Sequence, residues 1–213
     1  MEQKKQQSRG RFIVFEGIDG AGKTTQIDLL VRRLQAAGRR VHRTAEPTES
    51  VSGGLLRDAL GGVSKRTPSE LAALFVLDRI FHNTNPVSGI EVMLAEGIDV
   101  VCDRYYYSSL AYQGSETDEQ WVRDMNLNCP DIRRPDICIF LDLTPAQSME
   151  RIGKGRVTTE IYENEERLTR VRTQFFRALD SLKERDRICV VNAARSVEEI
   201  HEEIAGLVDT VLL

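Results

Sequence analysis

The sequence has no CxxC pair among its four cysteines, and it has only one tryptophan and six prolines in 213 residues. Scattered cysteines without ligand spacing argue against a zinc site or a dithiol redox centre, so we expect buried, reduced thiols. No apolar run approaches the roughly 20 residues of a membrane-spanning helix. Residues 1–11 are polar and basic, without the apolar core of a secretory signal. We therefore expect a disordered tail over residues 1–10 and a cytoplasmic protein.

An excess of positive charge is also missing. Lysine and arginine total 29 against 33 aspartate and glutamate residues, which gives a formal net charge of −4. Proteins that wrap nucleic acid need a basic face, so we predict no nucleic-acid partner and no membrane partner. Hydrophobic residues make up 41% of the chain. At this length, that is enough for the core of a single domain over residues 11–213.

Short apolar runs alternate with helical patterns along the whole chain. This alternation favours an α/β fold in three layers, with about five parallel strands and helices on both faces of the sheet. The predicted strands are residues 12–16, 40–44, 99–103, 136–143 and 188–192. The predicted helices are residues 23–37, 54–60, 68–96 with an interruption near 85–89, 105–113, 118–129, 145–152, 164–183 and 197–211.

A glycine-rich motif follows the first predicted strand. Residues 17–24, GIDGAGKT, fit G-x-x-x-x-G-K-[ST] at every fixed position and lie between a strand and a helix. The loop's amides can cradle phosphate oxygens, Lys23 can reach the β- and γ-phosphates, and the Thr24 hydroxyl can coordinate Mg²⁺. We therefore predict ATP and Mg²⁺ as cofactors. The residues expected at the nucleotide are Gly17, Gly20, Ala21, Gly22, Lys23, Thr24 and Thr25.

A second phosphate-binding feature follows the third predicted strand, in the tripeptide DRY at residues 103–105. Ligands of open α/β sheets collect beyond the carboxyl ends of the strands, so Arg104 is placed to clamp a second phosphate group. Asp103 can hold the water shell of Mg²⁺ or orient Arg104. The three consecutive tyrosines, Tyr105–Tyr107, cannot all point one way, and some of them must be core or surface.

The long predicted helix carries Phe75 and Arg79, four residues apart on one face. They can present a ring and a guanidinium to one ligand, but the spacing alone favours a core phenylalanine and a solvated arginine. His82 follows Arg79 by three residues and could line the site, but a core or surface position is the simpler expectation.

The order of these motifs resembles the thymidylate kinase family of P-loop nucleoside monophosphate kinases. The matching residues are FEGIDGAGKTTQ at 15–26, EPT at 46–48, LF at 74–75, DRY at 103–105 and AYQG at 111–114, within a resemblance over roughly residues 11–195. The resemblance implies a P-loop kinase fold and transfer of the ATP γ-phosphoryl group to dTMP, giving dTDP and ADP for dTTP synthesis. It also implies a homodimer formed through helix faces.

Position by position, the resemblance implies how the acceptor base is held. Phe75 matches a ring that stacks on thymine, and Arg79 matches an arginine that bonds the base. Ser109 and Gln113 match residues that read the polar edge of thymine. Tyr112 matches a ring near the deoxyribose, where it would disfavour a 2′-hydroxyl.

The same comparison implies the contacts of the acceptor's sugar and phosphate. Asp19 matches an acidic residue that contacts the 3′-hydroxyl, and Arg104 and Arg57 match arginines on the acceptor phosphate. Two positions depart from the family. Ala45 replaces an arginine of many bacterial members, which leaves more of the phosphate to Arg57. Gly20 replaces a P-loop residue that is basic in one branch, so the P-loop itself supplies no extra cation.

Residues 151–162 are predicted to form a small lid, because glycines and small polar residues interrupt the helical pattern there. Phosphoryl transfer depends mainly on positioning and charge compensation, so a lid arginine could swing onto the transferring group and exclude water. An exposed loop with ordinary surface charges would also fit this stretch. The expected catalytic set is Lys23, Arg104, Asp19, Arg151 and Arg156.

Two other functions remain open at this stage. The same reaction could take dUMP, dCMP or a nucleoside as the acceptor, because Phe75, Arg79 and Gln113 favour thymine without proving it. A nucleotide-dependent switch ATPase would hydrolyse ATP slowly and need no acceptor. The sequence has no NKxD motif and no long partner-binding segment, which argues against a switch.

Overall fold

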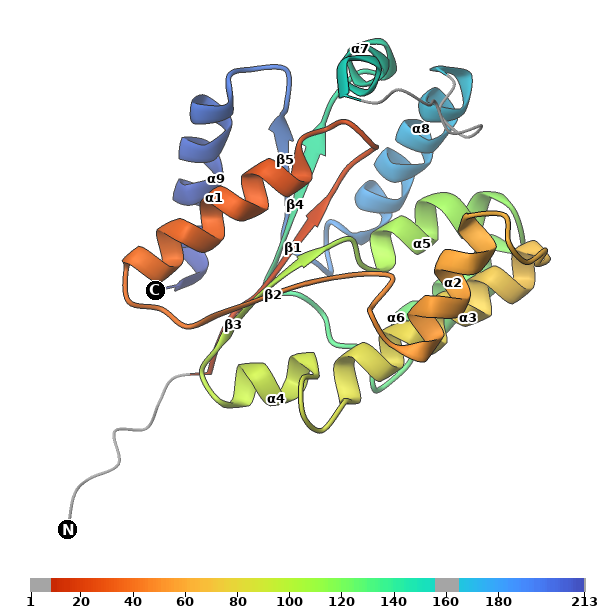
Figure 1. Cartoon of the computed structure of the whole chain (residues 1–213), viewed down its shortest axis with the longest axis horizontal. Helices are drawn as coiled ribbons and strands as arrows, with labels where there is room; N and C mark the ends of the chain where they lie inside the picture. The colour runs from red at the N-terminus through yellow and green to blue at the C-terminus, as the bar shows by residue number, and fades with distance from the viewer. Residues whose placement is uncertain (1–8, 156–164, 213) are drawn as a thin grey trace.

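A computed structural model describes residues 9–155 and 165–212. Within them, five parallel strands form one sheet in the order β2-β3-β1-β4-β5, with helices on both of its faces (Figure 1). The predicted α/β fold with three layers is confirmed. The elements are β1 (Phe12–Glu16), α1 (Lys23–Ala36), β2 (Val41–Ala45), α2 (Val51–Leu60), α3 (Pro68–Thr84), α4 (Ile90–Ala95), β3 (Asp99–Asp103), α5 (Tyr106–Tyr112), the 3₁₀-helix η1 (Gln113–Ser115), α6 (Glu119–Leu127), β4 (Ile137–Asp142), α7 (Pro145–Gly155), α8 (Glu165–Leu182), β5 (Ile188–Asn192) and α9 (Val197–Leu212).

The central strands are apolar throughout because both faces of the sheet are covered. In β1, Phe12 and Val14 pack into one hydrophobic core, and Ile13 and Phe15 pack into the other. Helices α1 and α9 cover the second core, whereas α3, α4, α5 and α8 lie on the side of the first (Figure 1). None of the helices in the described ranges is long and apolar enough to cross a membrane.

Two predicted segments, the N-terminal tail and the helix over residues 145–152, end at other residues in the structure. Gly10, expected in the tail, is buried, and its N–H donates to the carbonyl of Leu94 at 2.9 Å. The folded part therefore already includes residues 9 and 10, and residues 1–8 lie outside the described chain. Helix α7 continues through Gly153 to Gly155, past the predicted end at residue 152. The remainder of the predicted lid, residues 156–162, also lies outside the described residues.

The expectation of burial holds for two of the four cysteines. All four are free; Cys102 and Cys138 are buried in β3 and β4, and Cys129 and Cys189 are half-buried. Burial raises the pKa of the Cys102 and Cys138 thiols well above the usual range, which keeps them protonated and unreactive.

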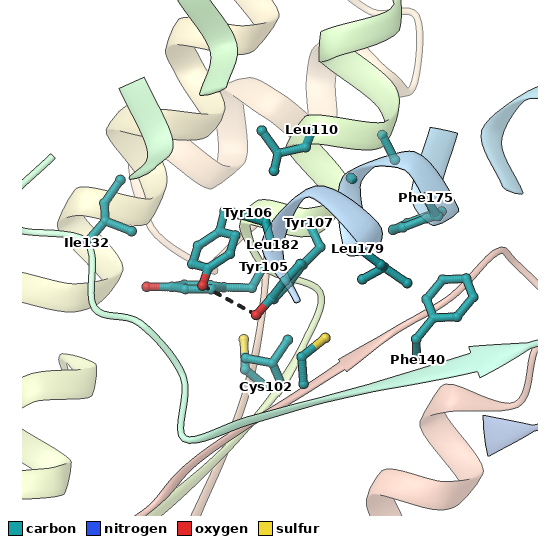
Figure 2. Close-up of a cluster of buried hydrophobic side chains, with 14 of the residues drawn as sticks. Cys102, Tyr105, Tyr106, Tyr107, Leu110, Ile132, Phe140, Phe175, Leu179 and Leu182 are labelled. Carbon is teal, nitrogen blue, oxygen red and sulfur yellow. Dashed lines mark hydrogen bonds between the residues drawn. The ribbon is translucent and has the colours of Figure 1, made fainter. Parts of the chain in front are cut away.

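Three consecutive tyrosines all belong to the core. Tyr105, Tyr106 and Tyr107 are 0% exposed and lie side by side in the first hydrophobic core (Figure 2). Tyr105 has an extended backbone and Tyr106 begins α5, so successive side chains do not alternate as they would in a strand. The hydroxyls of Tyr106 and Tyr107 donate to a buried carboxylate oxygen of Asp186 at 2.6 and 2.9 Å. This acceptor allows the polar ends of both rings to be buried.

Candidate active site

The phosphate-binding loop joins β1 to α1 at the carboxyl end of the sheet, the same end at which α7 begins (Figure 1). Gly17, Gly20 and Gly22 have φ angles of 142°, 75° and 92°, a region that glycine adopts readily. Gly22 is the N-cap of α1, so the positive end of this helix faces the loop. A Cβ atom at Gly20 would lie 3.0 Å from the carbonyl oxygen of Ser148 in α7. The packing of α7 therefore explains why this position carries no basic side chain.

Lys23 is buried inside the loop. Its Nζ donates to the carbonyl oxygens of Gly17 and Ile18 at 3.0 and 3.3 Å. Burial, and then the positive charge of Arg104, lower the pKa of Lys23 to about 8, although neighbouring carboxylates act in the opposite direction. The ammonium group is thus held on neutral carbonyls, where phosphate oxygens would be much stronger partners.

Arg104 lies just beyond β3 and faces the phosphate-binding loop. Its Nη2 donates to Oδ1 of Asp19 at 2.5 Å, and its Nη1 donates to the hydroxyl of Ser108 at 3.2 Å. Its φ angle is 68°, a left-handed conformation that costs a non-glycine residue about 1–2 kcal/mol. The surrounding contacts must therefore hold it. The contact with Asp19 therefore brings the two predicted phosphate-binding features together.

Glu16 and Ser108, to which the sequence assigned no role, hold the turn of Arg104 in place. Glu16, fully buried at the end of β1, accepts hydrogen bonds from the Tyr105 N–H at 2.8 Å, the Ser108 N–H at 3.1 Å and the Ser108 hydroxyl at 2.7 Å. Burial raises the pKa of Glu16, and the nearby charge of Arg104 acts to lower it. One signal was available: a glutamate that ends an otherwise apolar strand needs partners wherever it is buried.

Of the four residues predicted for the base, the structure brings Arg79 of α3 and Ser109 of α5 into contact. Arg79 is only 1% exposed, and its Nη1 donates to the hydroxyl of Ser109 at 3.2 Å. Gln113 is buried at the end of α5, and Phe75 is half-buried one turn before Arg79. The alternative of a solvated arginine at position 79 is therefore wrong. The contacts of these four residues with a base stay a prediction.

Of the remaining acceptor residues, Tyr112 lies beside Arg104, and the contacts of Arg57 are with the loop before α2. The Tyr112 ring centroid lies 5.6 Å from the guanidinium carbon of Arg104. On α2, Arg57 donates to the carbonyl of Thr48 and forms an ion pair with Glu49 at 3.5 Å. The reach of Arg57 to an acceptor phosphate stays a prediction.

Arg151 lies beside the phosphate-binding loop from α7. Its Nη2 donates to the carbonyl of Ala193 at 2.8 Å, and its Nη1 would lie 3.9 Å from a Cβ atom at Gly22. This side of the site therefore carries a cation although Gly20 offers none. Arg156, the second arginine of the predicted lid, lies outside the described residues.

Asp103 and Thr24 suit a Mg²⁺ ion that is shared with phosphates. Oδ1 of Asp103 is buried and has no hydrogen-bond partner. Thr24, in the first turn of α1, is exposed, as is Thr25. Mg²⁺ is usually held by one or two protein oxygens together with substrate phosphates and waters. No cluster of three His, Cys, Asp or Glu side chains able to hold a metal occurs in the described part of the chain.

The Glu16 contacts generate a stability prediction. Glu16→Ala should lower the free energy of unfolding by about 2–4 kcal/mol, because three buried donors lose their acceptor. Glu16→Gln keeps one acceptor oxygen and should lose less. Chemical denaturation followed by Trp121 fluorescence measures both, and Glu116→Ala at an exposed position is the control. Equal losses in the alanine and glutamine variants, or no loss in either, would contradict this role.

Comparison with known proteins leads to one family. The family model described as thymidylate kinase matches residues 15–204. The chain is 39% identical over 211 residues to a probable thymidylate kinase of Pyrococcus horikoshii, covering 96% of this chain and 98% of that protein. It is 36% identical over 199 residues to a probable thymidylate kinase of Methanocaldococcus jannaschii, covering 92% and 94%.

A probable thymidylate kinase of Methanothermobacter thermautotrophicus gives a similar match, 39% identical over 196 residues and covering 91% of each chain. These matches run through the phosphate-binding loop, the Arg104 turn and the helices between them. The family model covers most of the sequence. The chain therefore belongs to the thymidylate kinase family.

Proposed function

We propose that the protein transfers the γ-phosphoryl group of ATP to the 5′-phosphate of dTMP, giving dTDP and ADP for dTTP synthesis. The contact between Arg104 and Asp19 at 2.5 Å carries this proposal, because it joins an acceptor-phosphate arginine to the donor loop across one crevice. A single in-line step can then connect donor and acceptor. Family membership and the group around Arg79 support dTMP as the acceptor.

In this step an anionic oxygen of the acceptor phosphate attacks the γ-phosphorus, and the bond from that phosphorus to the β–γ bridging oxygen breaks. No general base is needed, because the attacking oxygen is already ionised near neutral pH. Lys23 stabilises charge on the donor side and Arg104 on the acceptor side, and Arg151 supplies a third cation from α7. Arg156 belongs to the same proposed lid.

The remaining residues orient the reactants. Asp19 contacts the sugar 3′-hydroxyl and holds Arg104. Thr24 and Asp103 would hold Mg²⁺, which neutralises charge on phosphate oxygens when it is bound. The unpartnered Oδ1 of Asp103 supports this assignment.

The direct test is a panel of acceptors. ADP formation should be strongly stimulated by dTMP, and dUMP and dCMP should be poorer acceptors. Lys23→Ala should lower kcat/KM for dTMP by more than about a hundredfold, because one preorganised cation is lost from the transferring group. Lys65→Ala, an exposed lysine outside the site, is the control, and circular dichroism checks folding. ADP formation that ignores dTMP, or near-normal turnover by Lys23→Ala, would refute the proposal.

The pKa of Lys23 predicts proton uptake when ATP binds. In the free protein this pKa is about 8, so at pH 8.5 a large part of Lys23 is neutral. Phosphate charge beside Nζ favours the ammonium form and raises the pKa, so binding must draw a proton from the buffer.

Calorimetry at about pH 8.5, in buffers of different ionisation enthalpy, counts the protons taken up. Lys23→Arg keeps a cation that does not titrate in this range, so its uptake should vanish. At about pH 6.5 Lys23 is already protonated, and its contribution to uptake should be lost in the wild type as well. Uptake that is unchanged in Lys23→Arg at pH 8.5 would show that another group titrates.

We also propose a homodimer formed through α2 and α3. Val51, Leu55, Leu77 and Phe81 are 86%, 40%, 53% and 44% exposed, and they line the outer part of a cavity of about 1110 Å³ that Asp103 also lines. A second copy would remove this apolar surface from water. Sedimentation should show a dimer that Leu77→Glu dissociates and that Val190→Glu, on β5, leaves intact. A wild-type monomer would overturn this assignment. The cytoplasmic location stays a prediction.

A further inference from the structure

A chain of hydrogen bonds runs from β2 to Arg79, the arginine predicted to bond the acceptor base. The phosphoryl transfer step itself does not use this chain. Nε and Nη2 of Arg79 donate to Oε2 of Glu46 at 2.8 and 2.6 Å. The other oxygen of Glu46, Oε1, lies 3.0 Å from Nδ1 of His82. Nε2 of His82 lies 2.8 Å from the hydroxyl of Thr44. Arg79, Glu46 and His82 are all at most 5% exposed.

A carboxylate accepts hydrogen bonds, so Nδ1 of His82 is the donor in its contact with Glu46. The other ring nitrogen, Nε2, is paired with the Thr44 hydroxyl. Each member has one partner on either side, and the chain ends at the guanidinium of Arg79.

Arg79 has little donor capacity left for a ligand. A guanidinium has five N–H donors. Nε and one N–H of Nη2 go to Glu46, and Nη1 donates to both Ser109 and Asn126. One N–H of Nη2 remains among the described contacts, and its direction follows from the plane in which Glu46, Ser109 and Asn126 hold the guanidinium. The group facing it must be an acceptor, such as a ring carbonyl of a pyrimidine.

We propose that His82 and Thr44 are positioning residues for recognition of the acceptor base: they hold Glu46 so that the last N–H of Arg79 points at a base carbonyl. The proposal rests on the proposed function, because it needs Arg79 to contact the base. Without His82, Oε1 of Glu46 would be buried without a partner, and the carboxylate would turn to find one. Arg79 would then lose the partner of its Nε and Nη2 atoms and turn about its remaining bonds to Ser109 and Asn126, while the phosphate-binding residues would keep their positions.

The substitutions that test this are chosen for their shape. His82→Leu fills the space but cannot donate to Glu46. His82→Asn places an amide N–H near the position of Nδ1, so it keeps the bond to Glu46 and loses only the one to Thr44. Thr44→Val removes the far end of the chain alone. Thr84→Val, at an exposed position of α3 whose hydroxyl donates to the carbonyl of Ile80, is the control.

Steady-state kinetics with ATP and dTMP give the readout. His82→Leu should raise the KM for dTMP about tenfold, the effect of losing roughly one hydrogen bond, with kcat and the KM for ATP changed less than about threefold. His82→Asn should recover most of this loss, and Thr44→Val should raise the KM for dTMP by about two- to threefold. Thr84→Val should match the wild type.

Other patterns overturn the proposal. If His82 only stabilised the fold, His82→Leu would lower kcat, or raise the KM for ATP, by as much as it raises the KM for dTMP. An unchanged KM for dTMP in His82→Leu, or no recovery in His82→Asn, would also reject it. Should His82→Leu fail to fold, an unchanged KM for dTMP in Thr44→Val would have the same force. Failure of the proposed function would look different, since wild-type ADP formation would then not respond to dTMP.

Discussion

The buried carboxylate of Glu16 is the interaction on which the geometry of the site depends. It ends the strand that leads into the phosphate-binding loop, and it binds two backbone N–H groups and one hydroxyl of the turn that carries Arg104. That turn includes the left-handed φ angle of Arg104, which the chain would not keep without support. Because β1 and β3 are neighbours, with Phe15 opposite Asp103, the loop and the turn emerge side by side, and Glu16 fixes their relation.

The electrostatics of the site favour anions before any ligand arrives. Lys23 is buried on neutral carbonyls and close enough to Arg104 for the two charges to oppose each other, which contributes to its lowered pKa. This arrangement is unfavourable for the isolated protein and becomes favourable when phosphate oxygens occupy the crevice. A lysine paired with a carboxylate would stabilise the free protein more. Lys23 on neutral carbonyls gives up that stability and gains affinity for the phosphates of the nucleotide.

The sequence predicted the fold and the phosphate-binding loop well, because both depend on local pattern. Alternating apolar runs and helical spacing place the five strands to within about a residue, and the loop motif is contiguous. The supports of the site could not be predicted in this way. Glu16 meets Ser108 and Glu46 meets His82 only through the order of the strands and the packing of α3. Periodicity indicates that a residue is buried, but the partner of a buried polar group comes from elsewhere in the chain.

The register of the sheet explains why two arginines, rather than one, can be held at fixed positions. Ala45 of β2 and Phe15 of β1 both lie opposite Asp103 of β3. The next residue of each strand is therefore at a common level, which places Glu46 and Glu16 on either side of Arg104.

One of these two carboxylates holds Arg104 through Ser108, and the other holds Arg79 directly. Their strands are two positions apart, about 10 Å, because neighbouring strands are spaced by nearly 5 Å. The carboxyl ends of β1 and β2 thus provide separate anchors, one for the arginine assigned to the acceptor phosphate and one for the arginine assigned to the base. Because the anchors are separate, a change at His82 would act on Glu46 and Arg79 and leave the Glu16 contacts of the Arg104 turn in place.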